Sequence, residues 1–416
     1  MEVVALVVAL VAGGAGALAT WYGRKPYHAQ RGDESRSAFV NERRLLGTRR
    51  AELTKLAIQY YPSHQSVNFP GMLSNSQWVP VIPFRLELLR LSYDTSGFSE
   101  DPSNRFASQT KKTLLPKNTS GEPFATYSEA LESLARPNLF NNLACYRLKR
   151  AELSSNPPAI SVGLTNFFDG INETEAIAHE LARAYLKYGI KTLNSLKAKD
   201  LPLRQLFSDP FDTKGRIAIF SVSALTIKLG ADPTFLLHAR DSAKVAMAGS
   251  SLHLTPSGVF QPTAQDPSTI ERDLSLWLTL CREYAEEFLG TPEASGEDGV
   301  ALSYFEDEPY ASINIAYSLE KIRVFVLGMG TDPLTLCPEV VTASIIDGDT
   351  YDEIFEDIQT ENDEGRMRGE RMLGGKIVGY PFTEKGVSEL LLRTDLSPAT
   401  RAGLETAWRN RDQLLP

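Results

Sequence analysis

The sequence predicts an α+β protein with a mixed sheet, preceded by one N-terminal transmembrane helix. Three observations lead to this prediction. A run of uncharged, mostly apolar residues opens the chain at 3–22. Short β-prone runs alternate with helical segments in the second half, for example at 217–227 and 322–327. Between those runs, the amphipathic segment at 270–289 predicts a helix that packs one face on the sheet.

The segment from Val3 to Tyr22 is long enough to cross a bilayer, because about 20 helical residues span the roughly 30 Å hydrocarbon core. Trp21 and Tyr22 close the segment, where aromatic rings favour the membrane interface. Basic residues follow it and none precedes it; they are Arg24, Lys25, Arg31 and Arg36. The positive-inside rule then predicts a single-pass cell-membrane protein with its N-terminus outside and its soluble region in the cytoplasm. The alternative is a cleaved signal peptide, since Ala17-Leu18-Ala19 resembles a cleavage site.

Length and charge limit the classes of function. The chain has 416 residues, enough for about two or three domains. Its net charge of −9 argues against nucleic-acid binding, which needs a basic surface to displace counterions. Cys145, Cys281 and Cys337 are far apart, odd in number and fit no zinc spacing. We therefore expect buried free thiols in a reducing compartment.

Two regions are expected between the transmembrane anchor at 1–22 and the second half of the chain. Residues 23–75 predict a solvated, helical juxtamembrane connector, because charges of both signs alternate there around a few apolar positions. A separate α+β region is expected at 76–210, packed on the domain that follows. The mostly apolar stretch at 78–93 would supply a strand to it.

Breakers and caps set the expected elements within that region. Residues 97–123 are rich in Ser, Asn, Pro and Gly and predict a long loop. Residues 126–152 and 173–196 predict helices. Asn172 is a good N-cap for the second of these, with Glu175 three residues later as in a capping box.

The domain expected at 211–395 contains most of the β-prone runs, which lie at 217–227, 234–238, 251–260, 322–327 and 340–346. The charged stretch at 353–370 is expected to be exposed, and a helix is expected at 383–393. A C-terminal helix at 396–416 closes the chain. Ser397-Pro398 predicts its start, because proline is well tolerated in the first helical turn.

The stretch Cys281–Gly290 carries the most informative chemistry. On a helix, Glu283, Glu286 and Glu287 lie at i, i+3 and i+4, so their carboxylates share one face. The opposite, apolar stripe consists of Leu274, Trp277, Leu278, Cys281, Ala285 and Phe288. Three adjacent carboxylates repel one another, and a bound Mg²⁺ or Mn²⁺ would reverse that effect because it prefers oxygen ligands. Arg282 is placed to pair with Glu286 one turn on.

This stretch resembles the second half of the Nudix box, the signature of Nudix hydrolases. The matching residues are Arg282-Glu283, Glu286-Glu287 and Gly290. Upstream, residues 255–262 resemble the Pro-Gly-Gly loop that precedes the catalytic helix in that family. The resemblance covers about 215–350 and is closest to membrane-anchored Nudix-like proteins of actinobacteria. It implies a Nudix-like α/β/α sandwich with a mixed sheet.

The resemblance also implies roles for individual residues. The implied catalytic residues are Arg282, Glu283, Glu286 and Glu287, and the three glutamates are also the implied Mg²⁺ or Mn²⁺ ligands. The implied substrate-binding residues are Gly258, Phe260 and Gln261. The reaction would be metal-assisted hydrolysis of a phosphoanhydride, with Glu287 the first choice as base. Later acids that could supply a further ligand are Glu339, Glu353 and Glu356.

Several departures from the box leave two functions open. The positions of the box glycine and the first box glutamate hold Ser268 and Leu274, and one extra residue separates Glu287 from Gly290. The first hypothesis is a membrane-anchored hydrolase of a nucleoside diphosphate derivative. The alternative is a catalytically inactive protein of the same family that senses a nucleotide or mediates an interaction.

Overall fold

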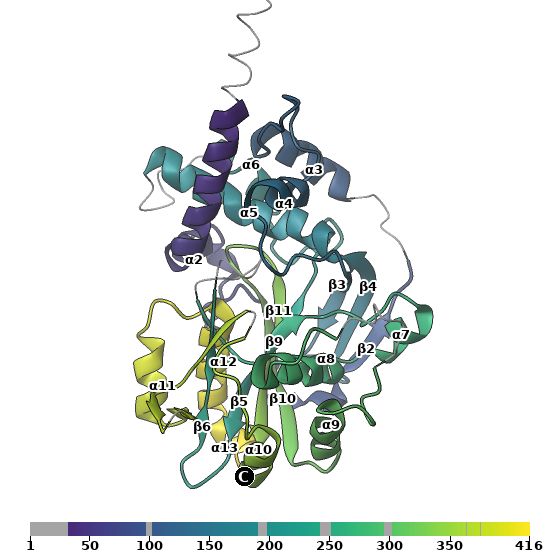
Figure 1. The fold of residues 1–416 in the computed structure, drawn as a ribbon, viewed down its shortest axis with the longest axis vertical. Coiled ribbons are helices and arrows are strands. Elements are labelled where there is room, and N and C mark those ends of the chain that lie inside the picture. The colour runs from purple at the N-terminus through teal and green to yellow at the C-terminus, as the bar shows by residue number, and fades with distance from the viewer. Residues whose placement is uncertain are drawn as a thin grey trace, which may run out of the picture.

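The computed structural model describes residues 32–96, 102–189, 198–241, 251–294, 302–362, 364–374 and 376–416 (Figure 1). Within these residues, seven strands form the largest sheet: β1 (Phe84–Arg85), β5 (Ser221–Lys228), β6 (Thr234–Phe235), β9 (Ser257–Val259), β10 (Ile322–Thr331), β11 (Pro338–Ile346) and β15 (Tyr380–Pro381). Their order is β1-β10-β11-β5-β6-β15, and β9 also pairs with β5. Strands β11 and β5 are parallel and the other pairs are antiparallel, so this sheet is mixed.

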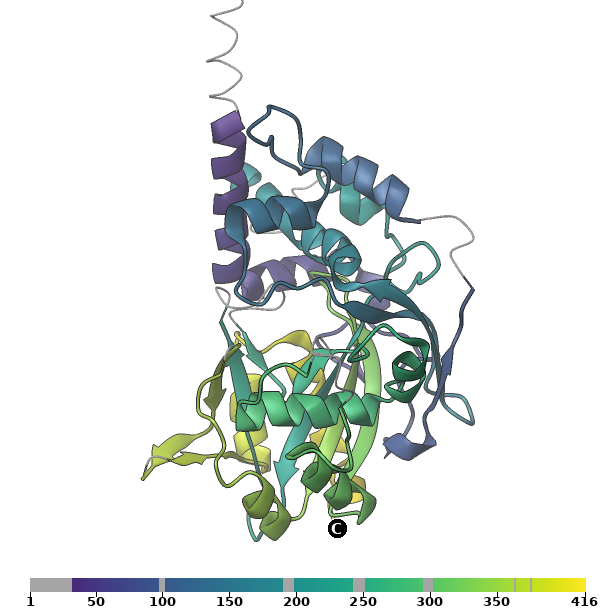
Figure 2. The same cartoon turned by 45° about the vertical axis from the view of Figure 1, so that its right-hand side comes forward.

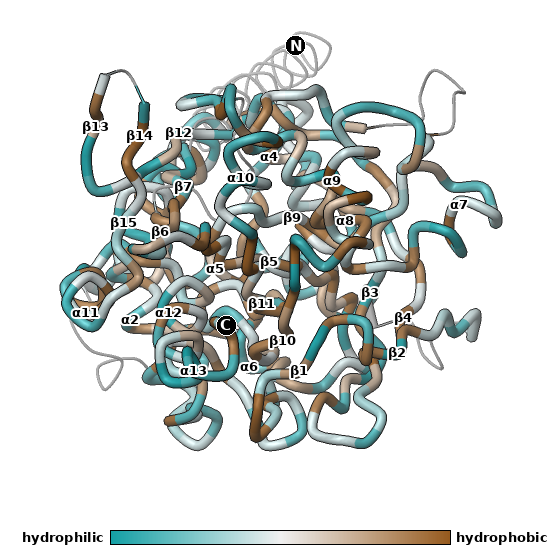
Figure 3. Tube along the Cα trace, turned by 90° about the horizontal axis from the view of Figure 1, so that it is seen from below, coloured by the Kyte–Doolittle hydropathy of each residue, from teal (hydrophilic) through white to brown (hydrophobic). Residues whose placement is uncertain are grey.

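Side chains of the central strands divide between two hydrophobic cores, because successive residues of a strand point to opposite faces of the sheet. In β11, Val341 and Ala343 belong to one core, whereas Val340 belongs to the other. The first core contains the buried face of α12 (Pro398–Arg409), and the second contains that of α8 (Leu276–Glu283). Figure 2 shows α8 lying across the strands, and Figure 3 shows that the strands in the middle of the molecule are hydrophobic.

Smaller sheets flank this one within the described residues. One consists of β2 (Arg90–Tyr93), β3 (Ala144–Glu152) and β4 (Ala159–Asn166). Another consists of β7 (Leu237–Arg240), β8 (Leu252–His253) and β12 (Gly365–Arg368), and a hairpin joins β13 (Arg371–Leu373) to β14 (Lys376–Val378). Backbone hydrogen bonds of 2.9 Å from Leu148 to Ala218 and from Tyr146 to Phe260 join β3 to the residues that flank β5 and β9.

Helices surround the sheets. Besides a helix at 32–48, the described residues contain α2 (Arg50–Ile58), α3 (Pro102–Thr113), α4 (Tyr127–Ala135), α5 (Phe167–Tyr188), α6 (Pro202–Gln205), α7 (Pro267–Arg272), α9 (Tyr310–Ser318), α10 (Gly348–Ile354), α11 (Glu384–Leu391) and α13 (Arg411–Leu414). Ser397 caps α12 and Pro398 occupies its first turn, which confirms the predicted start of the C-terminal helix.

Helix α5 carries several buried ionisable side chains, and each has a partner on another segment. Glu175 pairs with Arg43 and with Arg50. Glu173 accepts a hydrogen bond of 2.8 Å from Arg216. These pairs compensate charges that have lost their contact with water.

The next turns of α5 continue this pattern. His179 lies between two partners: its Nε2 is 2.9 Å from Oε2 of Glu42, and its Nδ1 is 3.0 Å from the hydroxyl of Tyr127. Glu180 accepts backbone hydrogen bonds from Leu203 and Arg204 at 2.7 and 3.0 Å. Helix α5 therefore ties together segments that are far apart in the sequence.

The prediction of a solvated connector at 23–75 is wrong for the residues that meet α5. Glu42 and Arg50 are only 8% and 7% exposed, and Phe39 and Leu53 are fully buried. The alternating charges do not indicate solvation here, because their partners lie on α5. Residues 23–31 lie outside the described residues.

The predicted helix at 126–152 is wrong in its second half. Helix α4 ends at Ala135, and residues 144–152 form the strand β3 instead. Pro137 accounts for the end of the helix, because the residue before a proline disfavours the α conformation. The period of Tyr146 and Leu148, both fully buried in one core, is that of a strand.

Two other local predictions also fail. The loop expected at 97–123 contains α3, which begins at Pro102. The expected helix start at Asn172 lies inside α5, which is capped by Asn166 with a capping box to Asp169. Both asparagines have an acidic residue three positions later, so the sequence pattern alone did not distinguish them.

The predicted fold class is wrong as stated, since it combined a Nudix-like α/β/α sandwich with a membrane-spanning helix. The structure is a mixed α/β protein with several sheets, and in the described residues no helix is both long and apolar enough to span a bilayer. The segment at 3–22, on which the transmembrane prediction rests, lies outside the described residues. The run at 234–238, expected as one strand, contains β6 and the start of β7, which belong to different sheets. Strand β6 pairs with β5 and β15, whereas β7 pairs with β8 and β12.

Candidate functional site

A cavity of about 390 Å³ lies beside the C-terminal end of α8. Its walls come from the last turns of that helical segment, from β9 and Gln261, and from Gln359, Glu361, Asn362 and Glu364. Residues 139–143 and Phe167 add a mainly apolar wall on another side. This volume lies within the range of roughly 300–1,000 Å³ that is typical of small-molecule sites.

Acidic side chains dominate this cavity, which we call the acidic cavity. Its glutamates are Glu283, Glu286, Glu287, Glu293, Glu361 and Glu364. Arg240 is the one cationic side chain among the described residues that line it. So many carboxylates in one small space repel one another unless protons or cations compensate them.

The helix that presents the first three glutamates is not the continuous one predicted at 270–289. Helix α7 ends at Arg272, and α8 begins at Leu276 with Ser275 as its N-cap. After α8, Tyr284–Phe288 form a π-helical turn. A π turn accommodates one additional residue within a helix.

Glu283 lies directly against Gly258 in β9. A Cβ atom added to Gly258 would be 1.6 Å from Oε1 of Glu283, so this approach requires glycine. Within the described residues, the Glu283 carboxylate makes no hydrogen bond or ion pair. Burial raises its pKa well above the ordinary value, and the neighbouring carboxylates of Glu286 and Glu364 raise it further, against the opposing effect of Arg240.

Glu286 lies on the next turn and accepts a hydrogen bond of 3.3 Å from the backbone N–H of Ala294. Burial raises its pKa to about 8, and the carboxylate of Glu293 contributes to this shift. Glu293 in turn accepts a hydrogen bond of 3.1 Å from Gln261. The Glu286 carboxyl group is therefore mostly protonated at neutral pH as long as no cation is bound.

Glu287 is held by several donors. Thr255 donates to its Oε2 at 2.5 Å, and the backbone N–H of Ser257 donates to its Oε1 at 3.2 Å. Arg240 donates to the same Oε1 at 3.3 Å. Burial raises the pKa of Glu287, whereas Arg240 lowers it. Both oxygens are engaged, so the position of this carboxylate is fixed.

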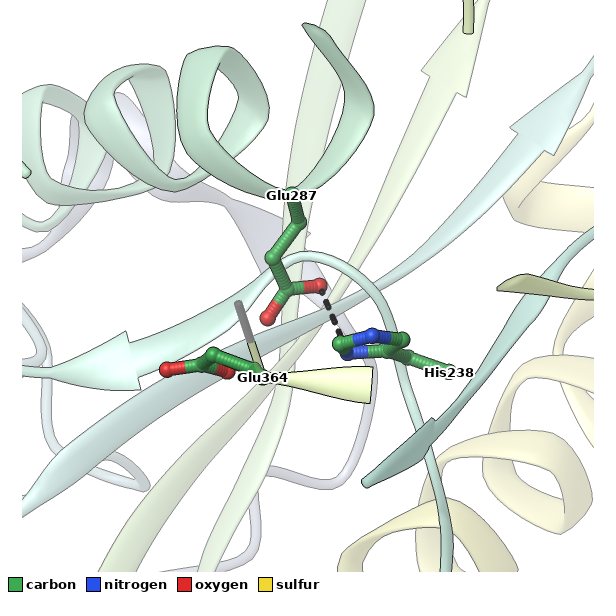
Figure 4. Close-up of side chains that lie close together, drawn as sticks. All are labelled: His238, Glu287 and Glu364. Atoms are coloured by element: carbon green, nitrogen blue, oxygen red, sulfur yellow. Dashed lines mark ion pairs between the residues drawn. The ribbon is translucent and has the colours of Figure 1, made fainter. Parts of the chain in front are cut away.

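His238 approaches Glu287 from β7, and Glu364 approaches it from the segment just before β12 (Figure 4). One ligand atom from each of the three residues lies within 4.8 Å of the others. Nδ1 of His238 is 3.7 Å from Oε2 of Glu287, and Oε2 of Glu364 is 2.9 Å from Nη2 of Arg240. Burial lowers the pKa of His238 to about 4, with a contribution from Arg240, so its ring is neutral at pH 7. At that pH, the approach of His238 to Glu287 is therefore not an ion pair.

Arg282 points away from this group. Its guanidinium donates to the hydroxyl of Tyr304, to the backbone carbonyl of Gln261 at 2.6 Å and to Thr279 at 3.3 Å. The expected pairing with Glu286 is absent among these contacts. Arg282 instead fastens the loop after β9 to α8 and so helps to position the cavity wall.

Of the three residues expected to bind substrate, two line the cavity and one does not. Gly258 and Gln261 line the cavity. Phe260 is fully buried and packs against Tyr146 and Phe220 in the core, so it does not line the cavity. Phe260 follows the end of β9, and its backbone exchanges hydrogen bonds of 2.9 Å with Phe220 and Tyr146.

The later acids considered as additional ligands lie elsewhere. Glu353 and Glu356 are exposed, and neither lines the cavity. Glu339 is on β11, where burial raises its pKa to about 7 and a hydrogen bond from Ser223 opposes the shift. The carboxylates that do join the three helical glutamates are Glu293, Glu361 and Glu364.

Sequence reasoning missed the contribution of β7 and of residues 361–364. His238 and Arg240 are two positions apart, so a strand places both side chains on one face. That spacing was a usable signal. Glu361 and Glu364 belong to the stretch that was expected to be exposed, and only the pairing of β12 with β7 brings it to the cavity.

No protein-family model matches this chain, and a search of curated proteins finds no match either. The function of the acidic cavity is therefore argued from its own residues.

Proposed function

We propose that the acidic cavity binds the diphosphate group of a nucleoside diphosphate derivative together with Mg²⁺ or Mn²⁺, and that it hydrolyses the phosphoanhydride bond. The observation that carries this proposal is the convergence of six glutamates and one arginine on a cavity of about 390 Å³. Such a surface repels a bare diphosphate, so an anionic ligand requires metal ions as intermediaries.

The residues present suit a hard divalent cation. Carboxylate oxygens are the ligands that Mg²⁺ and Mn²⁺ prefer. Glu283 has no hydrogen bond or ion pair within the described residues, and Glu286 has one weak backbone donor. Their raised pKa values reflect the cost of holding negative charge there without a cation. A bound ion would neutralise the diphosphate and activate it towards attack by water.

The three helical glutamates suit different tasks. Glu287 receives hydrogen bonds from Thr255, Ser257 and Arg240, so it is a poor base and a well-positioned ligand. Glu283 has no such donors and is placed to accept the proton of the attacking water. We therefore assign the role of base to Glu283 in place of Glu287.

Leu139, Phe140, Leu143 and Phe167 add apolar surface to the lining of the cavity. An amphiphilic ligand with a charged diphosphate and a less polar remainder fits such a cavity. The part of the ligand beyond the diphosphate would lie against this wall.

Binding without hydrolysis is the second candidate. Leu274, which occupies the position of the first glutamate of the Nudix box, packs against the hydrophobic core and brings no carboxylate to the site. A protein with this substitution would retain a metal–diphosphate site and lose part of the catalytic apparatus.

A titration of the full-length chain with ADP-ribose, NAD, nucleoside triphosphates and dinucleotides, with and without Mg²⁺, tests the proposal. We expect Mg²⁺-dependent binding that Glu286→Gln weakens by about tenfold or more, whereas the exposed Glu356→Gln leaves it unchanged. Release of a nucleoside monophosphate supports hydrolysis, and binding without release supports the second candidate. Binding that is unaffected by Glu286→Gln and Glu287→Gln would remove the site assignment.

A further inference from the structure

A second group of potential ligands lies at the edge of the acidic cavity. It consists of His238, Glu287 and Glu364, and we call it the His238 site. Their ligand atoms lie within 4.8 Å of one another, and the side chains of His238 and Glu287 are 0% and 2% exposed. The three residues come from β7, from the π-helical turn and from the segment just before β12, so the fold converges on this point from three directions (Figure 4).

His238 is the residue that the surrounding structure does not explain. It is fully buried, and neither ring nitrogen makes a hydrogen bond of normal geometry, although the Asn362 side chain and the Gly365 backbone lie close enough to raise its pKa. Buried polar atoms almost always have a partner, so two unpaired nitrogens on one ring indicate a missing one. Figure 4 shows the ring directed at the carboxylate of Glu287.

The geometry suits a common metal ion. Nδ1 of His238 lies 3.7 Å from Oε2 of Glu287. Two ligands at about 2.1 Å from one ion, at a roughly tetrahedral angle, are about 3.4 Å apart. Only a few tenths of an ångström of adjustment would therefore bring these two atoms into a shared coordination sphere.

The donor set also distinguishes this position from the one assigned to Mg²⁺. An imidazole nitrogen suits first-row transition metals such as Mn²⁺, Co²⁺ and Zn²⁺, whereas Mg²⁺ takes oxygen ligands almost exclusively. Glu283 and Glu286 offer only oxygen ligands. They line the cavity, whereas His238 does not.

We propose that His238, Glu287 and Glu364 bind a divalent transition-metal ion at a position separate from Glu283 and Glu286. Glu287, which faces both positions, contributes a carboxylate oxygen to this ion. The site does not depend on a phosphate ligand, so it stands or falls separately from the proposed hydrolysis.

Arg240 occupies the place of the cation in the metal-free protein. Its Nη2 lies 2.9 Å from Glu364 and 3.3 Å from Glu287, so it neutralises the two carboxylates that the ion would use. Metal binding requires the guanidinium to withdraw towards the cavity. Arg240→Gln should therefore tighten metal binding, whereas a purely structural arginine would give a weaker or unchanged site.

Pulsed electron paramagnetic resonance of the full-length chain with Mn²⁺ alone tests the ligand set, because a directly coordinated imidazole gives a nitrogen hyperfine coupling. We expect this coupling in the wild-type protein, and we expect His238→Gln to abolish it and to weaken Mn²⁺ binding by about tenfold or more. The matched control is His253→Gln on the neighbouring strand β8, whose ring bonds to Ser251 at 2.8 Å, and this variant should keep the coupling.

Glu283→Gln should also keep the nitrogen coupling while it impairs Mg²⁺-dependent nucleotide binding, which separates this inference from the proposed function. Absence of the coupling in the wild type would overturn the His238 site, as would its persistence in His238→Gln. If His238→Gln does not fold, Glu364→Gln decides, because this residue is partly exposed and its loss should weaken Mn²⁺ binding to a similar degree.

Discussion

Helix α5 and the acidic cavity both bury glutamates, but they provide for them differently. On α5, Glu173 and Glu175 meet arginines, and Glu180 meets two backbone N–H groups. In the acidic cavity, Glu287 and Glu364 share Arg240, whereas Glu283 and Glu286 have no ion pair among the described residues. Buried charge with a partner for each group is a structural device, whereas buried charge without partners indicates a site that is completed by a ligand.

The largest expected effect on stability comes from breaking an ion pair of α5. Glu175→Gln leaves Arg43 and Arg50 buried without their counter-charge, so the free energy of unfolding should fall by about 3–5 kcal/mol. Urea denaturation followed by circular dichroism measures this change. The control is Glu132→Gln, because Glu132 is about half exposed and its loss should cost no more than about 0.5 kcal/mol. A loss at position 175 as small as that of the control would contradict the comparison.

The second prediction concerns pH, and it applies to the metal-free protein. The pKa of Glu286 is about 8 in the folded state against 4.5 in the unfolded state, so the folded state binds more protons between these values. The contribution of Glu286 to the free energy of unfolding is therefore fully present below pH 4.5. It is lost as pH rises to about 8, by at most about 1.4 kcal/mol per pH unit.

The window from pH 6.5 to 8.5 isolates this effect from the buried histidines. His179 and His238 have folded pKa values of about 4, so they lower stability only as pH falls below 6.5. Glu180 and Glu339, with pKa values of about 7, contribute in the same direction as Glu286. The test is therefore the difference between the wild type and Glu286→Gln in urea denaturation. If the free energy of unfolding changed equally with pH in the two proteins, the raised pKa of Glu286 would be refuted.

The third prediction sharpens the role of the glycine beside Glu283. Gly258→Ala forces the Glu283 carboxylate to move, because the new methyl group would overlap it. The carboxylate is the flexible end of its side chain, so we expect little loss of stability but about tenfold weaker Mg²⁺ binding by calorimetry, or about 1.4 kcal/mol. Gly230→Ala is the control, since a Cβ atom there meets nothing within 4 Å. Unchanged Mg²⁺ affinity in Gly258→Ala would separate Glu283 from the metal.

The smallest expected effect comes from acids outside the cavity. Glu353→Gln and Glu356→Gln should change neither stability nor metal affinity by more than about 0.5 kcal/mol, because both side chains are exposed. Thermal denaturation with and without Mg²⁺ checks both quantities. A loss of the metal-induced stabilisation in either variant would mean that the cavity extends further than its described lining.

The sequence predicted those elements in which local signals and tertiary structure agree. Ser397 and Pro398 mark a helix start that the structure keeps, and the apolar runs at 322–327 and 340–346 lie within β10 and β11. It failed where a competing signal was equally good locally. Asn172 has the pattern of a cap, but Asn166 has the same pattern and the chain begins the helix there.

Part of the candidate site could also be predicted, because local helical spacing and the tertiary structure agree there. Helical spacing placed Glu283, Glu286 and Glu287 on one face, and the structure directs all three to the acidic cavity. The partners from β7 and the segment before β12 depend on long-range strand pairing, for which a single sequence carries little signal. The burial of Phe260 likewise depends on aromatic contacts with Tyr146 on β3 and with Phe220, just before β5.

The π-helical turn makes the spacing of this segment as important as its composition. Its wider path lets two consecutive residues, Glu286 and Glu287, address the same space, which a tighter helix would direct further apart. Removing a single residue between Tyr284 and Gly290 would let the turn contract and carry one of these carboxylates out of the cavity. A one-residue deletion in this stretch should therefore disturb the site even though it removes none of its glutamates.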